Sequence, residues 1–132
     1  MDFEQGGGEK NRGRQMEKEP VLLNSMETCA IRYAFMDAET ERPEAFSALE
    51  QSVGGHFLYT LEDGIPDKNE SFSIDVEQMP HANIVFANIA HIGLEQMKEN
   101  KNYATRLTCE HTIENHRQAL ESILKKFPVT EH

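Results

Sequence analysis

The sequence predicts a mainly α domain of about four helices, with a small β-hairpin between the second and third helices. An α+β class is the alternative. Apolar residues recur at spacings of three and four over long stretches, as in amphipathic helices. Pro20, Pro43 and Pro80 precede or open three of these stretches, whereas one short segment alternates polar and apolar residues, as half-buried strands do.

Residues 1–19 differ in composition from the rest of the chain. They contain Gly6-Gly7-Gly8, mixed charges, and only Phe3 and Met16 as sizeable apolar side chains. Such a segment cannot bury enough surface to offset the entropy of ordering it. We therefore expect a disordered tail over 1–19 and a single acidic helical domain over 20–132.

The first two helices follow the tail. Apolar residues from Leu22 to Met36 predict an amphipathic helix over roughly 20–38. A short charged connection leads to Pro43, which suits the first turn of a second helix. The pair Gly54-Gly55 predicts where this helix ends.

The predicted hairpin comes next. Residues 56–61 form a short, continuous apolar run that favours a buried strand over a helix, although periodicity alone leaves both open. Residues 62–70 contain Asp63-Gly64 and Ile65-Pro66, which are typical of a loop. Residues 71–76 alternate in polarity and predict the second strand.

Two long helices complete the predicted domain. Residues 81–99 are apolar almost all round, and residues 103–127 carry an apolar stripe that ends before Pro128. The short connection at 100–102 makes these helices an antiparallel hairpin. Because the first of them needs cover on several sides, we expect a homodimer through residues 81–127.

The charge is uneven and suggests the class of partner. The net charge is −10, and residues 37–77 hold eleven carboxylates against Arg42 and Lys68. Such a field repels phosphate backbones and anionic membranes, so a basic protein partner is expected. The function predicted is a non-enzymatic interaction domain of adaptor, inhibitor, immunity or chaperone type. The expected partner-binding residues are Asp37, Glu39, Glu41, Glu44, Glu50, Glu62 and Asp63.

The alternative function is a small-molecule-binding domain. A pocket would lie between the helical hairpin and the β-hairpin, although the same aromatic side chains serve equally well in a core. The residues that would line it are Phe57, Tyr59, Phe72, Phe86 and Tyr103.

Enzymatic, metal and cofactor chemistry is not favoured by any motif. His91, Cys109, His111 and His116 are available side chains, but His111 and His116 are five residues apart and so diverge around a helix axis. Cys109 and His116 share a face, but it is apolar, and no glycine-rich turn near Cys109 offers an oxyanion hole. We therefore expect no catalytic residues, no metal and no cofactor.

The two cysteines, Cys29 and Cys109, bear on the compartment. Small secreted domains usually carry more cysteines at closer spacing, and no apolar leader or membrane-length segment is evident. Free thiols in a reducing cytoplasm are expected, with one disulfide as the alternative.

Overall fold

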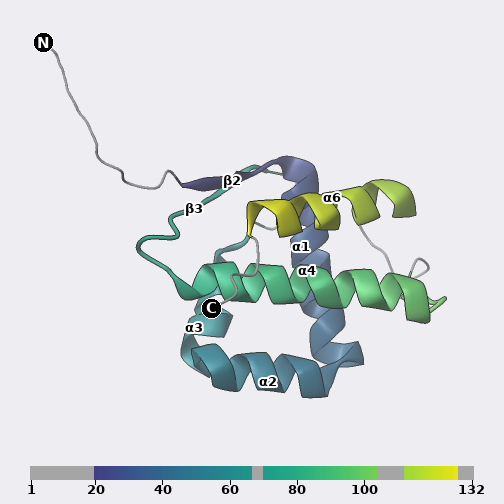
Figure 1. Ribbon diagram of the computed structural model, residues 1–132, viewed down its shortest axis with the longest axis horizontal. Coiled ribbons are helices and arrows are strands. Elements are labelled where there is room, and N and C mark those ends of the chain that lie inside the picture. The colour runs from purple at the N-terminus through teal and green to yellow at the C-terminus, as the bar shows by residue number, and fades with distance from the viewer. Residues whose placement is uncertain (1–19, 67–69, 104–111, 128–132) are drawn as a thin grey trace, which may run out of the picture.

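The computed structural model describes residues 20–66, 70–103 and 112–127 (Figure 1). The predicted fold class is confirmed: the described residues form five helices and one two-stranded antiparallel sheet. The chain order is β2 (Val21–Leu23), α1 (Ser25–Glu41), α2 (Pro43–Val53), α3 (Gly55–Gly64), β3 (Phe72–Ile74), α4 (His81–Glu99) and α6 (Ile113–Lys126). The predicted tail, Cys109 and His111 lie outside the described residues.

The first predicted helix begins later than expected. Residues 21–23 form β2, and α1 starts only after Asn24. The Asn24 side chain accepts from the Glu27 N–H at 2.8 Å, and the Glu27 carboxylate accepts from the Asn24 N–H at 2.9 Å. This capping box satisfies two N–H groups that the first turn leaves open. At its other end α1 continues to Glu41, through most of the expected connection.

The second helix matches its prediction, and the segment after it does not. Helix α2 runs from Pro43 to Val53 and stops at Gly54, whose φ of +92° is a conformation that side-chain-bearing residues rarely adopt. The predicted strand at 56–61 is wrong, because these residues belong to α3. Leu58, Leu61 and Ile65 are buried at helical spacing, so the run is one face of a short amphipathic helix.

The predicted second strand exists but pairs differently. Residues 72–74 form β3, which lies antiparallel to β2 with Leu22 opposite Ser73. The sheet therefore joins the start of the domain to the segment before α4, and the expected hairpin between the second and third helices is wrong in its pairing. Leu23 and Ile74 point into the core, where both are fully buried.

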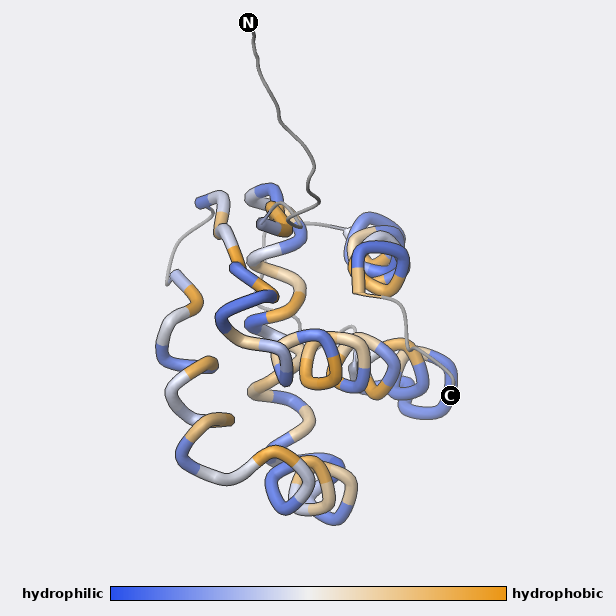
Figure 2. The backbone as a smooth tube through the Cα atoms, turned by 60° about the vertical axis from the view of Figure 1, so that its left-hand side comes forward, coloured by the Kyte–Doolittle hydropathy of each residue, from blue (hydrophilic) through white to orange (hydrophobic). Residues whose placement is uncertain are grey.

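Helix α4 lies at the centre of the described structure. In both views it lies between α2 and α6, and α1 crosses it (Figures 1 and 2). Helix α6 runs back along α4, so the predicted antiparallel arrangement is confirmed for the described residues, but α6 begins at Ile113 after the Thr112 cap and not at 103. Neighbouring helices of the same chain bury most of the apolar surface of α4, including Val85, Phe86 and Ile89.

Cys29 on α1 is disulfide-bonded, so the expectation of free thiols is wrong and the alternative holds. The chain's other cysteine, Cys109, lies outside the described residues. Within the described ranges, none of the helices has the length and apolar character needed to cross a bilayer.

Candidate interaction surface

Carboxylates from three helices surround an exposed tyrosine. Tyr59 on α3 is 40% exposed, and its ring packs against Phe46 of α2 with centroids 6.3 Å apart. The Glu50 carboxylate of α2 lies within electrostatic range of its phenol. Glu39 of α1 and Glu62 of α3 also lie within electrostatic range of the phenol. We call Glu39, Glu50, Tyr59, Glu62 and Asp63 the acidic surface.

The pKa directions on this surface report crowded negative charge. Partial desolvation and the carboxylates of Glu50 and Glu39 raise the pKa of Tyr59. Burial, followed by the charges of Glu39 and Asp63, raises the pKa of Glu62, and Arg32 opposes that rise only in part. Like charges held close together raise an acid's pKa because ionisation adds to the repulsion. The surface therefore carries a negative potential that Arg32 offsets only in part.

Three of the predicted partner-binding residues lie elsewhere. Asp37 is only 6% exposed and accepts a 2.8 Å hydrogen bond from the side chain of Gln96 on α4, so it joins α1 to α4 and does not face solvent. Glu41 and Glu44 flank a separate hollow at the junction of α1 and α2. Glu41 and Glu44 are close in sequence to the other predicted residues, but the turn at Arg42 places them on a different side of the molecule from Tyr59.

The five aromatic residues of the alternative pocket engage in separate contacts. Phe72 and Phe86 pack on each other, Phe86 also stacks on Phe127, and Phe57 contacts His81. Tyr103 is 1% exposed and packs against Tyr33. The hollow that the described residues form between α2 and α4 is lined by none of the five.

The histidines occupy different environments. His116 is fully buried, with Nε2 2.6 Å from the Tyr103 hydroxyl, and its ring also contacts Tyr33 edge-on. His91 is exposed and lies 3.1 Å from the Glu95 carboxylate one turn along α4. Among the residues that the structure describes, no three His, Cys, Asp or Glu side chains are grouped to hold a metal ion.

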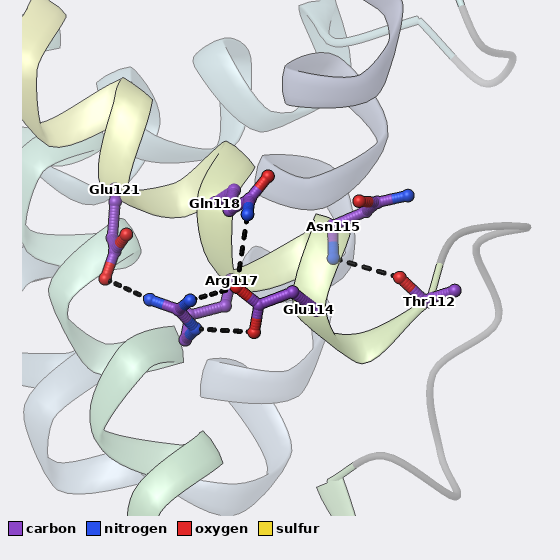
Figure 3. Close-up of polar contacts among 6 residues, drawn as sticks. All are labelled: Thr112, Glu114, Asn115, Arg117, Gln118 and Glu121. Atoms are coloured by element: carbon purple, nitrogen blue, oxygen red, sulfur yellow. Dashed lines mark hydrogen bonds and ion pairs between the residues drawn. The ribbon is translucent and has the colours of Figure 1, made fainter.

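Two cations that could neutralise the acidic surface are engaged elsewhere. On α6, Arg117 donates to Glu114 and, at 2.6 Å, to Glu121, next to the Thr112 cap of that helix (Figure 3). Lys126 at the end of α6 donates to buried Glu27 at 2.6 Å. Both cations belong to α6, whereas the acidic surface belongs to α1, α2 and α3.

Sequence reasoning did not place Tyr59 among the acidic residues. It placed Tyr59 in the alternative pocket and residues 56–61 in a strand, and these residues form α3 instead. On one helix, residues three apart share a face, so Tyr59 and Glu62 are neighbours. The apolar residues Leu58, Leu61 and Ile65 have helical spacing in the sequence, but over so short a run this spacing does not distinguish a helix from a strand.

Comparison with protein-family models, curated proteins and solved structures found no match to this chain.

Proposed function

We propose that this chain is a non-enzymatic interaction domain that binds a basic protein surface through its acidic surface. The observation that carries the proposal is Tyr59, an exposed aromatic side chain set among three carboxylates from α1, α2 and α3, with a fourth, Asp63, beside Glu62. Exposed aromatic rings in negative surroundings favour Arg and Lys, which contact the ring face and the carboxylates together. The net charge of −10 adds long-range attraction to such a partner.

The test is capture of a basic protein from native lysate at low and then moderate salt. The proposal expects a captured protein that is released as salt screens the charges. A variant with Glu39→Gln, Glu50→Gln and Glu62→Gln should lose it. The matched control, with Glu70→Gln, Glu77→Gln and Glu121→Gln, has the same net charge and should retain it. Equal loss from both variants would show that only net charge matters and would refute the proposed surface.

The contribution of Tyr59 is tested separately from charge. Tyr59→Leu keeps an apolar side chain and all four carboxylates but removes the aromatic ring. We expect weaker capture with an unchanged salt dependence, since the ring adds contact energy and the carboxylates set the salt response. Unchanged capture would remove Tyr59 from the proposed surface.

Compartment and oligomeric state belong to the proposal as well. A cytoplasmic location stays a prediction, and the Cys29 disulfide weighs against it, because cytosolic thiols are usually kept reduced. Rapid alkylation of thiols in intact cells shows whether Cys29 is a reduced thiol or is disulfide-bonded in the cell. Homodimerisation through residues 81–127 also stays a prediction, and light scattering at high micromolar concentration tests it.

A further inference from the structure

A hollow of about 370 Å³ lies between α2 and α4. Exposed small side chains of α2 form one wall, namely Ala45, Ala48 and Ser52. Their spacing of three and four residues places them in one row along the helix. Small side chains in such a row let another helix approach the α2 backbone closely. We call this hollow the α2–α4 groove.

The other wall and the floor of the groove come largely from α4. Ile84, Asn88 and His91 line the wall at spacings of four and three, and Ile84 is 41% exposed although it is a large apolar residue. Buried Leu49 and Ile92 form the floor. The groove thus combines an apolar floor with two parallel rows of exposed positions, the arrangement that receives an amphipathic helix.

The direction of the two helices is fixed by an ion pair at one end. Arg42, at the start of α2, lies 2.6 Å from Glu99, at the end of α4. The helices are therefore antiparallel, as Figure 1 also shows. Helices α2 and α4 are thus antiparallel neighbours, and each lines the groove with residues three and four positions apart. Helices in a helical bundle pack side by side in this way.

Charge at the same end points to the chemistry of the occupant. Glu95 lines the groove there, and an adjoining hollow that shares Ala45 is lined by Glu41 and Glu44. The Arg42 guanidinium beside them is already paired with Glu99, and the His91 imidazole lies 3.1 Å from Glu95. This end of the groove is therefore net negative and complements lysine or arginine.

We infer that the α2–α4 groove binds an amphipathic helix of a partner protein. Its large apolar side chains, at spacings of three and four, fill the hollow over Leu49 and Ile92, and its Lys or Arg side chains meet Glu41, Glu44 and Glu95. A second copy of this chain fits less well, because its own groove offers Ile84 as the one large exposed apolar side chain among these lining residues.

The groove is a different surface from the acidic surface. Both involve α2, but Glu50 is two residues before Ser52, which places it about 160° away around the helix axis. Binding in the groove therefore does not rest on the function proposed above. The Glu39, Glu50 and Glu62 triple variant leaves the groove intact and distinguishes failure of one proposal from failure of the other.

The test uses a labelled helical peptide of Leu, Ala and Lys, about 14 residues or four turns long. Its leucines lie on one face and its lysines at one end, and a scrambled peptide of the same composition is the control. Fluorescence anisotropy should show saturable binding of the amphipathic peptide and at least about tenfold weaker binding of the scrambled one. Absence of saturable binding, or equal binding of both peptides, would overturn the inference.

Two matched variants locate the binding. Ala48→Arg fills the groove and repels the lysines of the peptide, so it should weaken peptide binding by about tenfold or more. Gln51→Arg makes the same charge change at an exposed position of α2 that does not line the groove, and should leave affinity within about twofold. Circular dichroism establishes that both variants fold. Equal weakening by the two would show that only net charge acts and would refute the site.

Light scattering tests whether a second copy of this chain occupies the groove instead. The inference expects Ala48→Arg to leave the oligomeric mass unchanged. Conversion of a dimer to a monomer by Ala48→Arg, with Gln51→Arg still dimeric, would assign the groove to self-association and overturn the inference.

Discussion

At the scale of single residues, Gly93 decides how closely three helices approach. A Cβ built at this position would lie 2.8 Å from Cδ1 of Leu120 and 3.3 Å from Cβ of Ala34. Leu120 is fully buried, so it has no free space into which to move. Glycine at this point allows α4 to pack directly on α1 and α6.

Gly93→Ala should therefore destabilise the fold even though alanine favours helix. Alanine improves helix propensity by about 1 kcal/mol, whereas overpacking a full core costs about 1–3 kcal/mol, so a net loss is expected. Gly64→Ala is the matched control, because nothing lies within 4 Å of a Cβ there. Urea denaturation should show a lower midpoint for the first variant and an equal or higher one for the second.

Substitution of Glu62 should increase the stability of the fold, whereas Gly93→Ala should decrease it. Burial and the nearby Glu39 and Asp63 raise the pKa of Glu62 in the folded chain, so its charged form is disfavoured by folding. The resulting cost to stability is present above the folded-state pKa and vanishes as pH falls below the ordinary value of 4.5. Glu62→Gln should raise stability at pH 7 by up to about 0.5 kcal/mol, a gain absent below that value.

Thermal denaturation at several pH values measures this gain. Glu121→Gln serves as the control, because that carboxylate is paired with Arg117 and its removal should not stabilise the fold. A stabilised control, or a Glu62→Gln gain that persists at acid pH, would contradict the charge explanation.

At the scale of elements, one carboxylate ties the start of α1 to the end of α6. Glu27 is 2% exposed, caps α1 through Asn24, and accepts hydrogen bonds from Ser122 and Lys126. Burial raises its pKa, but the hydrogen bonds from Lys126, Ser122 and the Asn24 backbone outweigh this and lower it overall. Lys126 also donates to the Leu22 carbonyl at 2.8 Å, which extends the link to β2.

Glu27→Gln keeps the shape and the cap but removes the charge. Because the folded-state pKa is depressed, the stabilisation is present above the ordinary value of 4.5 and is lost as pH falls through the folded-state pKa. We expect a loss of about 1–2 kcal/mol at pH 7 that shrinks in acid. A double-mutant cycle with Lys126→Met isolates the pair, and additive effects would show that the two side chains are not coupled.

The element scale also shows where prediction from sequence succeeded. Proline and glycine located α2, whose bounds depend on local chemistry at Pro43 and Gly54. The capping box of Asn24 and Glu27 was readable in the sequence and would have placed the start of α1 correctly. The run at 56–61 was ambiguous, because a six-residue apolar segment fits a buried strand or one face of a helix equally well.

At the scale of the whole molecule, the disulfide at Cys29 is a covalent constraint on α1. Disulfides stabilise small domains by about 2–4 kcal/mol, chiefly by restricting the unfolded chain in the usual account. We expect reduction of the wild-type protein to lower its melting temperature and Cys29→Ser to lower it without added reductant. The variant should show no further response to reductant, and a response there would contradict this assignment.

The arrangement of carboxylates is also a property of the whole molecule. Seven acidic residues were expected to form one face, and the fold gathers Glu39, Glu50 and Glu62 around Tyr59, with Asp63 beside Glu62. It buries Asp37 against Gln96 instead. Periodicity places a residue on a face of its own helix, but only the packing of helices decides which faces meet.

The sequence by itself determined the mainly helical class, the extents of α2 and α4, and the acidic balance of 37–77. These follow from local preferences and from composition, which need no knowledge of distant contacts. The tertiary structure alone decided the pairing of β2 with β3, the helical state of 56–61, the burial of Asp37 and the α2–α4 groove. Each of these depends on contacts between segments far apart in the chain, and their free energy outweighs weak local preference.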